Sequence, residues 1–113
     1  CGYVLRHETE PVCYLAGDTI WYCGVRRNID RWSPQVIIVN AGGNKFHLGG
    51  HVIMHIPDVL KTMDYAPAAT FVATHLEGVN HNQVTRVALR EEVMKCGKAD
   101  RIHIPEDGEI VEL

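Results

Sequence analysis

Three polar side chains follow apolar, strand-like runs, and their positions point to chemistry at one edge of a sheet. Asp18 comes after residues 12–16, Asn40 ends residues 35–40, and His75 follows residues 70–74. In an open α/β sheet, ligands and metals bind at the edge where the carboxyl ends of the strands meet. An Asp and a His from neighbouring strand ends would suit a metal site or an acid–base pair.

Each of these residues also has a simpler structural explanation. Asp18 follows Gly17, and Asp in such a place commonly forms an Asx turn with its own backbone. Asn40 precedes Ala-Gly-Gly, which is typical of a turn. A lone His after a strand is commonly a solvated loop residue or a hydrogen-bonded core residue. Position alone therefore leaves both a ligand role and a turn role open for Asp18.

Other catalytic motifs are absent from the sequence. His51 and His55 have the spacing of the zinc-protease helix, but Val52 stands where that motif has Glu, and the segment favours β structure. There is no Gly-x-Ser-x-Gly, phosphate loop or Gly-x-Gly-x-x-Gly. The four cysteines lack Cys-x-x-Cys spacing. Cys13, in an apolar strand, and Cys96, on a predicted helix core face, are expected to be structural.

Strands and helices alternate along the chain and would position these residues. Strands are predicted at residues 2–6 and 12–16 (an antiparallel hairpin), 35–40, 70–74, 101–104 and 109–111, with 51–55 a short strand or extended connection. The predicted inward helix positions are Val25, Ile29 and Trp32, then Val59, Leu60 and Met63, then Leu89, Val93 and Cys96. This alternation indicates a layered α/β sheet with mostly parallel central strands.

Particular residues mark the expected helix ends. Ser33, which precedes a proline, should end the first helix. Pro57 suits the first turn of the second helix. Thr85 is a good N-cap for the third helix and Gly97 a good C-cap.

Length and composition limit the class of protein. With 113 residues, of which 46% are apolar, the chain is expected to form a single domain spanning residues 1–113. A net charge of −3, with no basic run longer than Arg26-Arg27, argues against nucleic-acid binding. No apolar stretch approaches the ~20 residues of a membrane span, so we expect no membrane insertion. Reduced thiols in a cytoplasmic protein are the simplest account of the cysteines.

Three segments, taken in order, resemble a known family. They are residues 15–21 (Leu-Ala-Gly-Asp-Thr-Ile-Trp), 37–43 (Ile-Ile-Val-Asn-Ala-Gly-Gly) and 72–75 (Val-Ala-Thr-His). The chain resembles the C-terminal half of a metallo-β-lactamase-fold metal-dependent hydrolase, in the branch that includes ascorbate-6-phosphate lactonase-like enzymes. The resemblance continues through Asn80-His81, Thr85-Arg86 and residues 105–109.

The resemblance implies an α/β fold that is half of a four-layer αββα sandwich. It would have one mixed sheet with helices packed on one face. The other face would then expose an apolar patch, which predicts a partner chain. The expected partner is the N-terminal half of the same fold or a self-associating copy of this chain. Because the chain starts at Cys1 and enters a strand almost at once, we also expect it to be part of a longer protein.

The resemblance also implies a site for two divalent ions, with Zn the first expectation and Mn or Fe the alternatives. Asp18 would bridge the two ions, and His75 would ligate the second. His81 matches a family position and would either support a ligand or contact the substrate. In the complete fold, a metal-bound hydroxide would cleave an ester, lactone or phosphoester bond of a small molecule.

One departure from the family limits what the chain should do alone. The family's His-x-His-x-Asp-His motif, which supplies most of the metal ligands, is absent from these residues. Two protein ligands make a poor dinuclear site, so the isolated chain is expected to bind metal weakly and to be inactive. The alternative is a non-catalytic α/β half-fold that acts as an oligomerisation or binding module.

Overall fold

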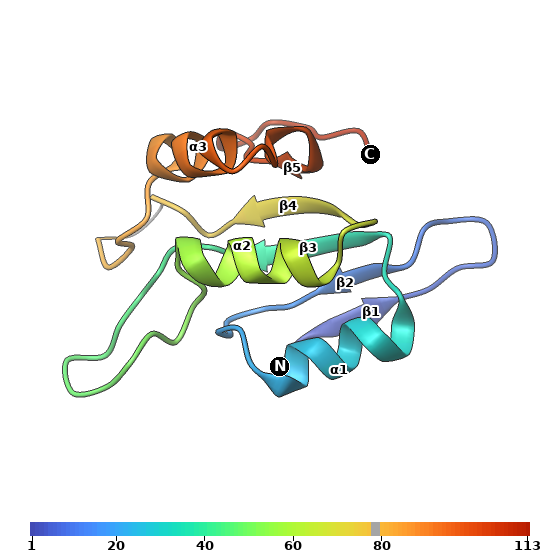
Figure 1. Ribbon diagram of the computed structural model, residues 1–113, viewed down its shortest axis with the longest axis horizontal. Helices are drawn as coiled ribbons and strands as arrows, with labels where there is room; N and C mark the ends of the chain where they lie inside the picture. Colours follow the sequence, from blue (N-terminus) through green and yellow to red (C-terminus); the bar gives the residue numbers. More distant parts are fainter. Residues whose placement is uncertain (78–79) are drawn as a thin grey trace.

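Five strands form one mixed sheet whose spatial order follows the chain (Figure 1). The computed structural model describes residues 1–113 except residues 78 and 79. The strands are β1 (Tyr3–Leu5), β2 (Cys13–Leu15), β3 (Val36–Asn40), β4 (Thr70–Thr74) and β5 (Ile102–His103). β1 pairs with β2 in the predicted antiparallel hairpin, and the other three pairings are parallel. The predicted α/β class with parallel central strands is therefore confirmed.

A helix lies in each parallel connection. These helices are α1 (Cys23–Trp32), α2 (Ile56–Tyr65) and α3 (Arg86–Lys95), and a short 3₁₀ turn, η1 (Ala99–Arg101), precedes β5. Successive strands are added in one direction and such crossovers are right-handed, so the three helices cover the same face of the sheet. Figure 1 shows all three helices on that face. The expectation of one mixed sheet with helices on one face is confirmed.

The burial of the strand residues reflects this one-sided cover. One register row across the sheet faces the helices and consists of Val4, Tyr14, Ile37, Phe71 and Ile102. Ile37 and Phe71 in this row are completely buried. The adjacent row, on the opposite face, consists of Tyr3, Leu15, Ile38, Val72 and His103. Tyr3 in that row is 63% exposed, Leu15 and Ile38 are half-buried, and Val72 is buried.

Most of the predicted inward helix positions are buried. They are Val25 and Ile29 in α1, Val59 and Met63 in α2, and Leu89 and Val93 in α3. Trp32 is only half-buried, because it ends α1 and packs beneath the guanidinium groups of Arg6 and Arg31, 5.2 and 4.7 Å from its ring centroid. The prediction for Cys96 is wrong, since this residue is exposed.

The end of α3 explains the error at Cys96. Gly97 adopts a φ of +67°, its N–H donates to the Met94 carbonyl, and the Lys98 N–H donates to the Val93 carbonyl. These two bonds form a Schellman motif. Cys96 is therefore the C-cap residue, at the very end of α3, rather than an interior position of the helix. Gly97 terminates the helix as predicted.

The other predicted helix ends are also confirmed. The Thr85 hydroxyl accepts a hydrogen bond from the Ala88 N–H at 3.1 Å, as expected of an N-cap. Pro57 lies in the first turn of α2. Ser33 is the C-cap of α1, in the left-handed conformation. None of the helices in the described residues has the length and apolarity needed to cross a membrane.

One predicted strand is not formed, and residues 51–55 take the second of their two predicted forms. Residues 109–111 form no strand, and Ile110 is 88% exposed. Residues 51–55 are an extended connection in which His51 forms a single antiparallel bridge with Lys45.

A half-buried arginine holds the C-terminal tail in place of a strand pairing. Arg86, the first residue of α3, donates from Nε to the Pro105 carbonyl at 2.7 Å and from Nη2 to Asp107 at 2.6 Å. Its Nη1 lies 2.5 Å from Glu77 Oε2, and its backbone N–H donates to Glu77 Oε1 at 2.7 Å. Arg90 adds a bond to Glu106 at 2.8 Å. Charged hydrogen bonds therefore join the tail, α3 and the loop after β4.

This cluster makes part of the stability depend on pH. The bonds from the Arg86 backbone N–H and guanidinium lower the pKa of the Glu77 carboxyl below its ordinary value of 4.5. Since the folded-state pKa is lowered, this contribution is complete above pH 4.5 and is lost as the pH falls through the lowered pKa. Urea unfolding from about pH 7 to about pH 3 should show a weaker acid dependence in Glu77→Gln. Glu91→Gln, at an exposed position on α3, should keep the wild-type dependence; equal curves for the wild type and Glu77→Gln would contradict the assignment.

Candidate metal-binding site

The carboxyl ends of β2, β3 and β4 meet at one edge of the sheet, because these strands are parallel and adjacent. This edge is at the left of Figure 1. Asp18 lies three residues beyond β2, Asn40 is the last residue of β3, and His75 follows β4 directly. The structure thus places all three predicted strand-end residues at the same edge.

A chain of hydrogen bonds links three side chains along this edge. Asn40 Nδ2 donates to Asp18 Oδ1 at 2.6 Å, and the Thr74 hydroxyl donates to Asn40 Oδ1 at 2.9 Å. The second carboxylate oxygen of Asp18 accepts no hydrogen bond from any residue that the structure describes. Asp18 is exposed. The side chain is therefore held by a neutral amide, and one of its oxygens remains available to a ligand.

His75 is held mainly through its backbone. Its φ is +56°, in the left-handed region that residues with a side chain rarely adopt. The side-chain amide of Asn82 donates to the His75 carbonyl at 3.1 Å and also to the Leu76 carbonyl. Backbone conformations of this kind are concentrated at functional sites. The sequence predicts a metal-ligand role for His75 but contains no motif that assigns a role to Asn82.

The donors at this edge suit a divalent metal but do not complete a site. Carboxylate oxygen and neutral imidazole nitrogen are both common ligands of Zn, Mn and Fe. Among the residues that the structure describes, however, no group of three or more His, Cys, Asp and Glu side chains could hold an ion. This chain therefore supplies donors of the right chemistry but not a full ligand set. The metal roles of Asp18 and His75 stay predictions.

Two further histidines lie near this edge, at the loop that follows β3. The rings of His51 and His55 stack with centroids 4.0 Å apart and planes 10° apart. His51 Nδ1 is 2.9 Å from the Gly43 carbonyl, and His55 Nδ1 is 3.0 Å from Asp58 Oδ2. Their segment is not helical, consistent with the rejection of a zinc-protease motif.

The predicted role of His81 also remains a prediction. His81 is exposed. The polar loop predicted at residues 77–82 includes residues 78 and 79, which lie outside the described residues.

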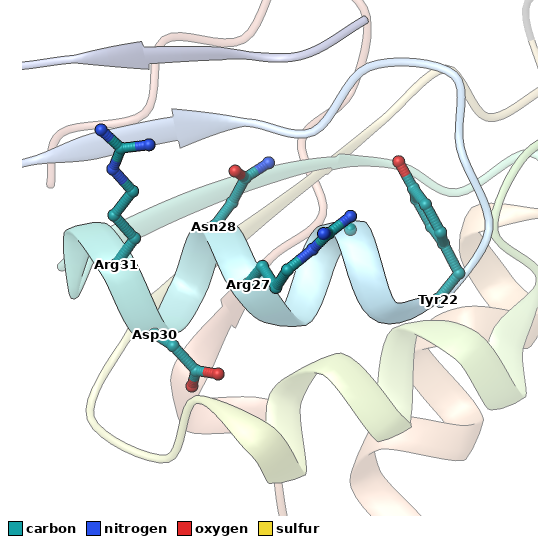
Figure 2. Close-up of a pocket in the computed structure, with 6 residues that line it drawn as sticks. Tyr22, Arg27, Asn28, Asp30 and Arg31 are labelled. Atoms are coloured by element: carbon teal, nitrogen blue, oxygen red, sulfur yellow. The ribbon is translucent and has the colours of Figure 1, made fainter.

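A surface groove lies elsewhere, along α1 (Figure 2). It has a volume of about 660 Å³ and is lined by Tyr22, Gly24, Arg27, Asn28, Asp30 and Arg31. Figure 2 shows Arg27, Asn28 and Arg31 projecting from one side of the helix and Asp30 from the other. None of the strand-end residues lines this groove, so it is not the candidate metal site.

One comparison matches most of this chain to part of a longer relative. No family model matches it. It is 38% identical over 109 residues to the UPF0173 protein YddR of Bacillus subtilis (strain 168). That alignment covers 96% of this chain and 43% of the relative. The chain thus spans less than half the length of the relative it matches.

Solved structures of hydrolases share this fold. An isothiocyanate hydrolase from Delia radicum gut bacteria is 40% identical with a TM-score of 0.93, and the match covers 96% of this chain and 43% of that one. A possible metal-dependent hydrolase from Veillonella parvula DSM 2008 is 31% identical with a TM-score of 0.94, covering 99% and 43%.

A more distant structure agrees in fold. Igni18, a metallo hydrolase from Ignicoccus hospitalis KIN4/I, is 21% identical with a TM-score of 0.74, and the match covers 97% of this chain and 44% of that one. The resemblance found in the sequence is therefore confirmed, and this chain corresponds to the C-terminal half of a metallo-β-lactamase-like hydrolase.

Proposed function

We propose that this chain forms part of a metal-dependent hydrolase that cleaves an ester, lactone or phosphoester bond in a small molecule. The observation that carries the proposal is the Asp18 carboxylate, held by Asn40 at the carboxyl edge of the sheet with one oxygen available. Two hydrolases of the same fold support it, one of which is described as a possible metal-dependent hydrolase. Because the 40% identical structure is an isothiocyanate hydrolase, an isothiocyanate belongs in the panel of test substrates.

The residues at the strand ends have distinct proposed roles. Asp18 bridges two divalent ions, with Zn expected and Mn or Fe as alternatives, and His75 ligates one of them. Asn40 and Thr74 orient the Asp18 carboxylate through their hydrogen-bonded chain. His81 contacts the substrate or supports a ligand. When bound, the metal pair polarises the scissile bond and lowers the pKa of water.

We propose that the remaining ligands come from outside these 113 residues. A dinuclear site needs more protein donors than Asp18 and His75 can supply. We propose that they come from an N-terminal half that carries the His-x-His-x-Asp-His motif. In this arrangement Asp18 and His75 face the other half across the strand edge, and neither half binds the metals tightly alone.

Removal of the proposed ligands tests the metal assignment. In the full-length zinc-loaded protein, Asp18→Asn or His75→Ala should release bound zinc and lower hydrolysis by at least about 100-fold, because a ligand matters at least as much as the groups that orient it. Metal content by mass spectrometry and turnover of the substrate panel provide the measurements.

Matched controls come from the opposite edge of the sheet. Asp100, in the turn before β5, and His7, in the loop between β1 and β2, lie at that edge and are exposed. Asp100→Asn and His7→Ala should retain zinc and activity. Unchanged zinc content and turnover in Asp18→Asn would refute the bridging role.

We also propose that the helix-free face of the sheet is a docking surface. Its occupant is the N-terminal half of the fold, or a second copy when that half is missing. Tyr3 and Leu5 on this face are 63% and 57% exposed, and Leu15 and Ile38 are half-buried beside them. Covering an apolar face of this kind is favourable, because it removes apolar surface from water. A non-catalytic binding module would use the same surface.

The 113-residue chain on its own tests this surface. It should self-associate in analytical ultracentrifugation, and Ile38→Lys should shift it toward monomer because a charge then replaces an apolar side chain in the contact. Val87→Lys, at an exposed position on α3, should leave the association unchanged. A monomeric wild-type chain would contradict the docking surface. A stable oligomer of the chain, together with a full-length protein that binds no zinc, would favour the non-catalytic module.

A further inference from the structure

We propose that Asn82 is a positioning residue for His75, fixing the backbone from which the imidazole projects and thereby setting metal affinity. This inference rests on the proposed function, in which His75 is a metal ligand. It concerns a residue that no sequence motif marks. The contacts of Asn82 with His75, Leu76 and Gly42 carry it.

The unusual backbone of His75 has no local explanation. Among the described residues other than glycine, only Ser33 and His75 have positive φ values, +43° and +56°. Ser33 is the C-cap of α1, where its N–H donates to the Ile29 carbonyl and the left-handed conformation is expected. His75 instead follows a strand. Some other contact must therefore hold it in this conformation.

The side-chain amide of Asn82 provides that contact. Nδ2 donates to the carbonyls of His75 and Leu76, seven and six residues earlier in the chain. Leu76 is 2% exposed, so one of these bonds anchors the turn to the core. Asn82 Oδ1 is buried and has no hydrogen-bond partner among the described residues. The amide thus acts here as a double donor, which a carboxylate cannot do.

Gly42, just beyond the end of the neighbouring strand β3, packs closely against the turn at His75. A Cβ atom at Gly42 would lie 2.4 Å from the His75 carbonyl oxygen and 2.9 Å from Asn82 Cγ, so only glycine permits this approach. The Gly42 carbonyl accepts hydrogen bonds from the N–H groups of Gln83 and Val84, at 2.8 and 3.1 Å. The turn at His75 is therefore locked between β3 and the segment that carries Asn82.

The same strand end also orients the other proposed ligand. Asn40, two residues before Gly42, holds Asp18. One short segment of backbone, residues 40–42, thus contacts both proposed ligands. A change at Asn82 should move His75 relative to Asp18 without disturbing Asp18 itself. Metal affinity is sensitive to such orienting contacts.

A double-mutant cycle in the full-length protein tests this inference. Zn²⁺ affinity, measured by competition with a chelator, should weaken about 10- to 100-fold in Asn82→Ala and Asn82→Asp. Gly42→Ala should weaken it similarly. In a His75→Ala background, Asn82→Ala should cause no further loss, because the residue acts through His75.

A matched control separates positioning from general stability. Asn28 also donates from its side-chain amide, to the Tyr14 hydroxyl at 3.1 Å, and it lies on α1. Asn28→Ala should lower the unfolding temperature without changing zinc affinity. Affinity is measured well below each unfolding temperature, and Asn82→Ser serves if Asn82→Ala does not fold.

The outcomes distinguish this inference from the proposed function. If His75→Ala leaves zinc affinity unchanged, the proposed metal role of His75 is wrong, and the positioning role falls with it. If His75→Ala weakens binding but the folded Asn82 variants bind as the wild type does, only the positioning role is overturned. Equal losses from Asn82→Ala with and without His75 would also overturn it.

Discussion

The pairing of β3 with β4 is the constraint on which the rest of this structure depends. The two strands are parallel and in register over five residue pairs, from Val36 with Thr70 to Asn40 with Thr74. Because the last pair sits at the carboxyl edge, the Thr74 hydroxyl reaches Asn40, and Asn40 reaches Asp18. A one-residue slip would turn these side chains to the opposite face. The core on one face and the polar edge at its end are thus consequences of the same register.

Two carboxylates in this region, those of Glu77 and Asp18, are held by different chemistry. Glu77 accepts hydrogen bonds from the Arg86 guanidinium and backbone N–H. These bonds pair its negative charge with a positive one and lower its pKa. Asp18 accepts its bond from the neutral amide of Asn40, which orients the carboxylate without offsetting its charge. A carboxylate bonded only to a neutral amide can still attract a cation, whereas one paired with a guanidinium serves to hold a loop in place. This contrast supports a ligand role for Asp18 over a simple turn role.

Local patterns predicted those features that local physics decides. The β-branched run in β3, the cap at Thr85 and the stop at Gly97 each depend on neighbouring residues, and each was confirmed. The strand-end position of Asp18 followed from strand order alone. The error at residues 109–111 arose because distant groups intervene: these residues have a strand-like composition, but the tail just before them is held by Arg86 and Arg90. The role of Asn82 was equally hidden, because its partners are backbone carbonyls that have no sequence signature.

The composition of β3 also bears on what covers the second face of the sheet. Its run Val-Ile-Ile-Val is apolar at every position, as in strands that are buried on both sides. Helices cover only one side, where Ile37 and Val39 are fully buried; on the other side Ile38 is half-buried, although Val36 is buried. A sheet that faced water on this side would normally alternate apolar with polar residues. The absence of alternation at the centre of the sheet therefore favours a covered second face. A partner packed there, at the same edge as Asp18 and His75, would be positioned to supply the ligands that this chain lacks.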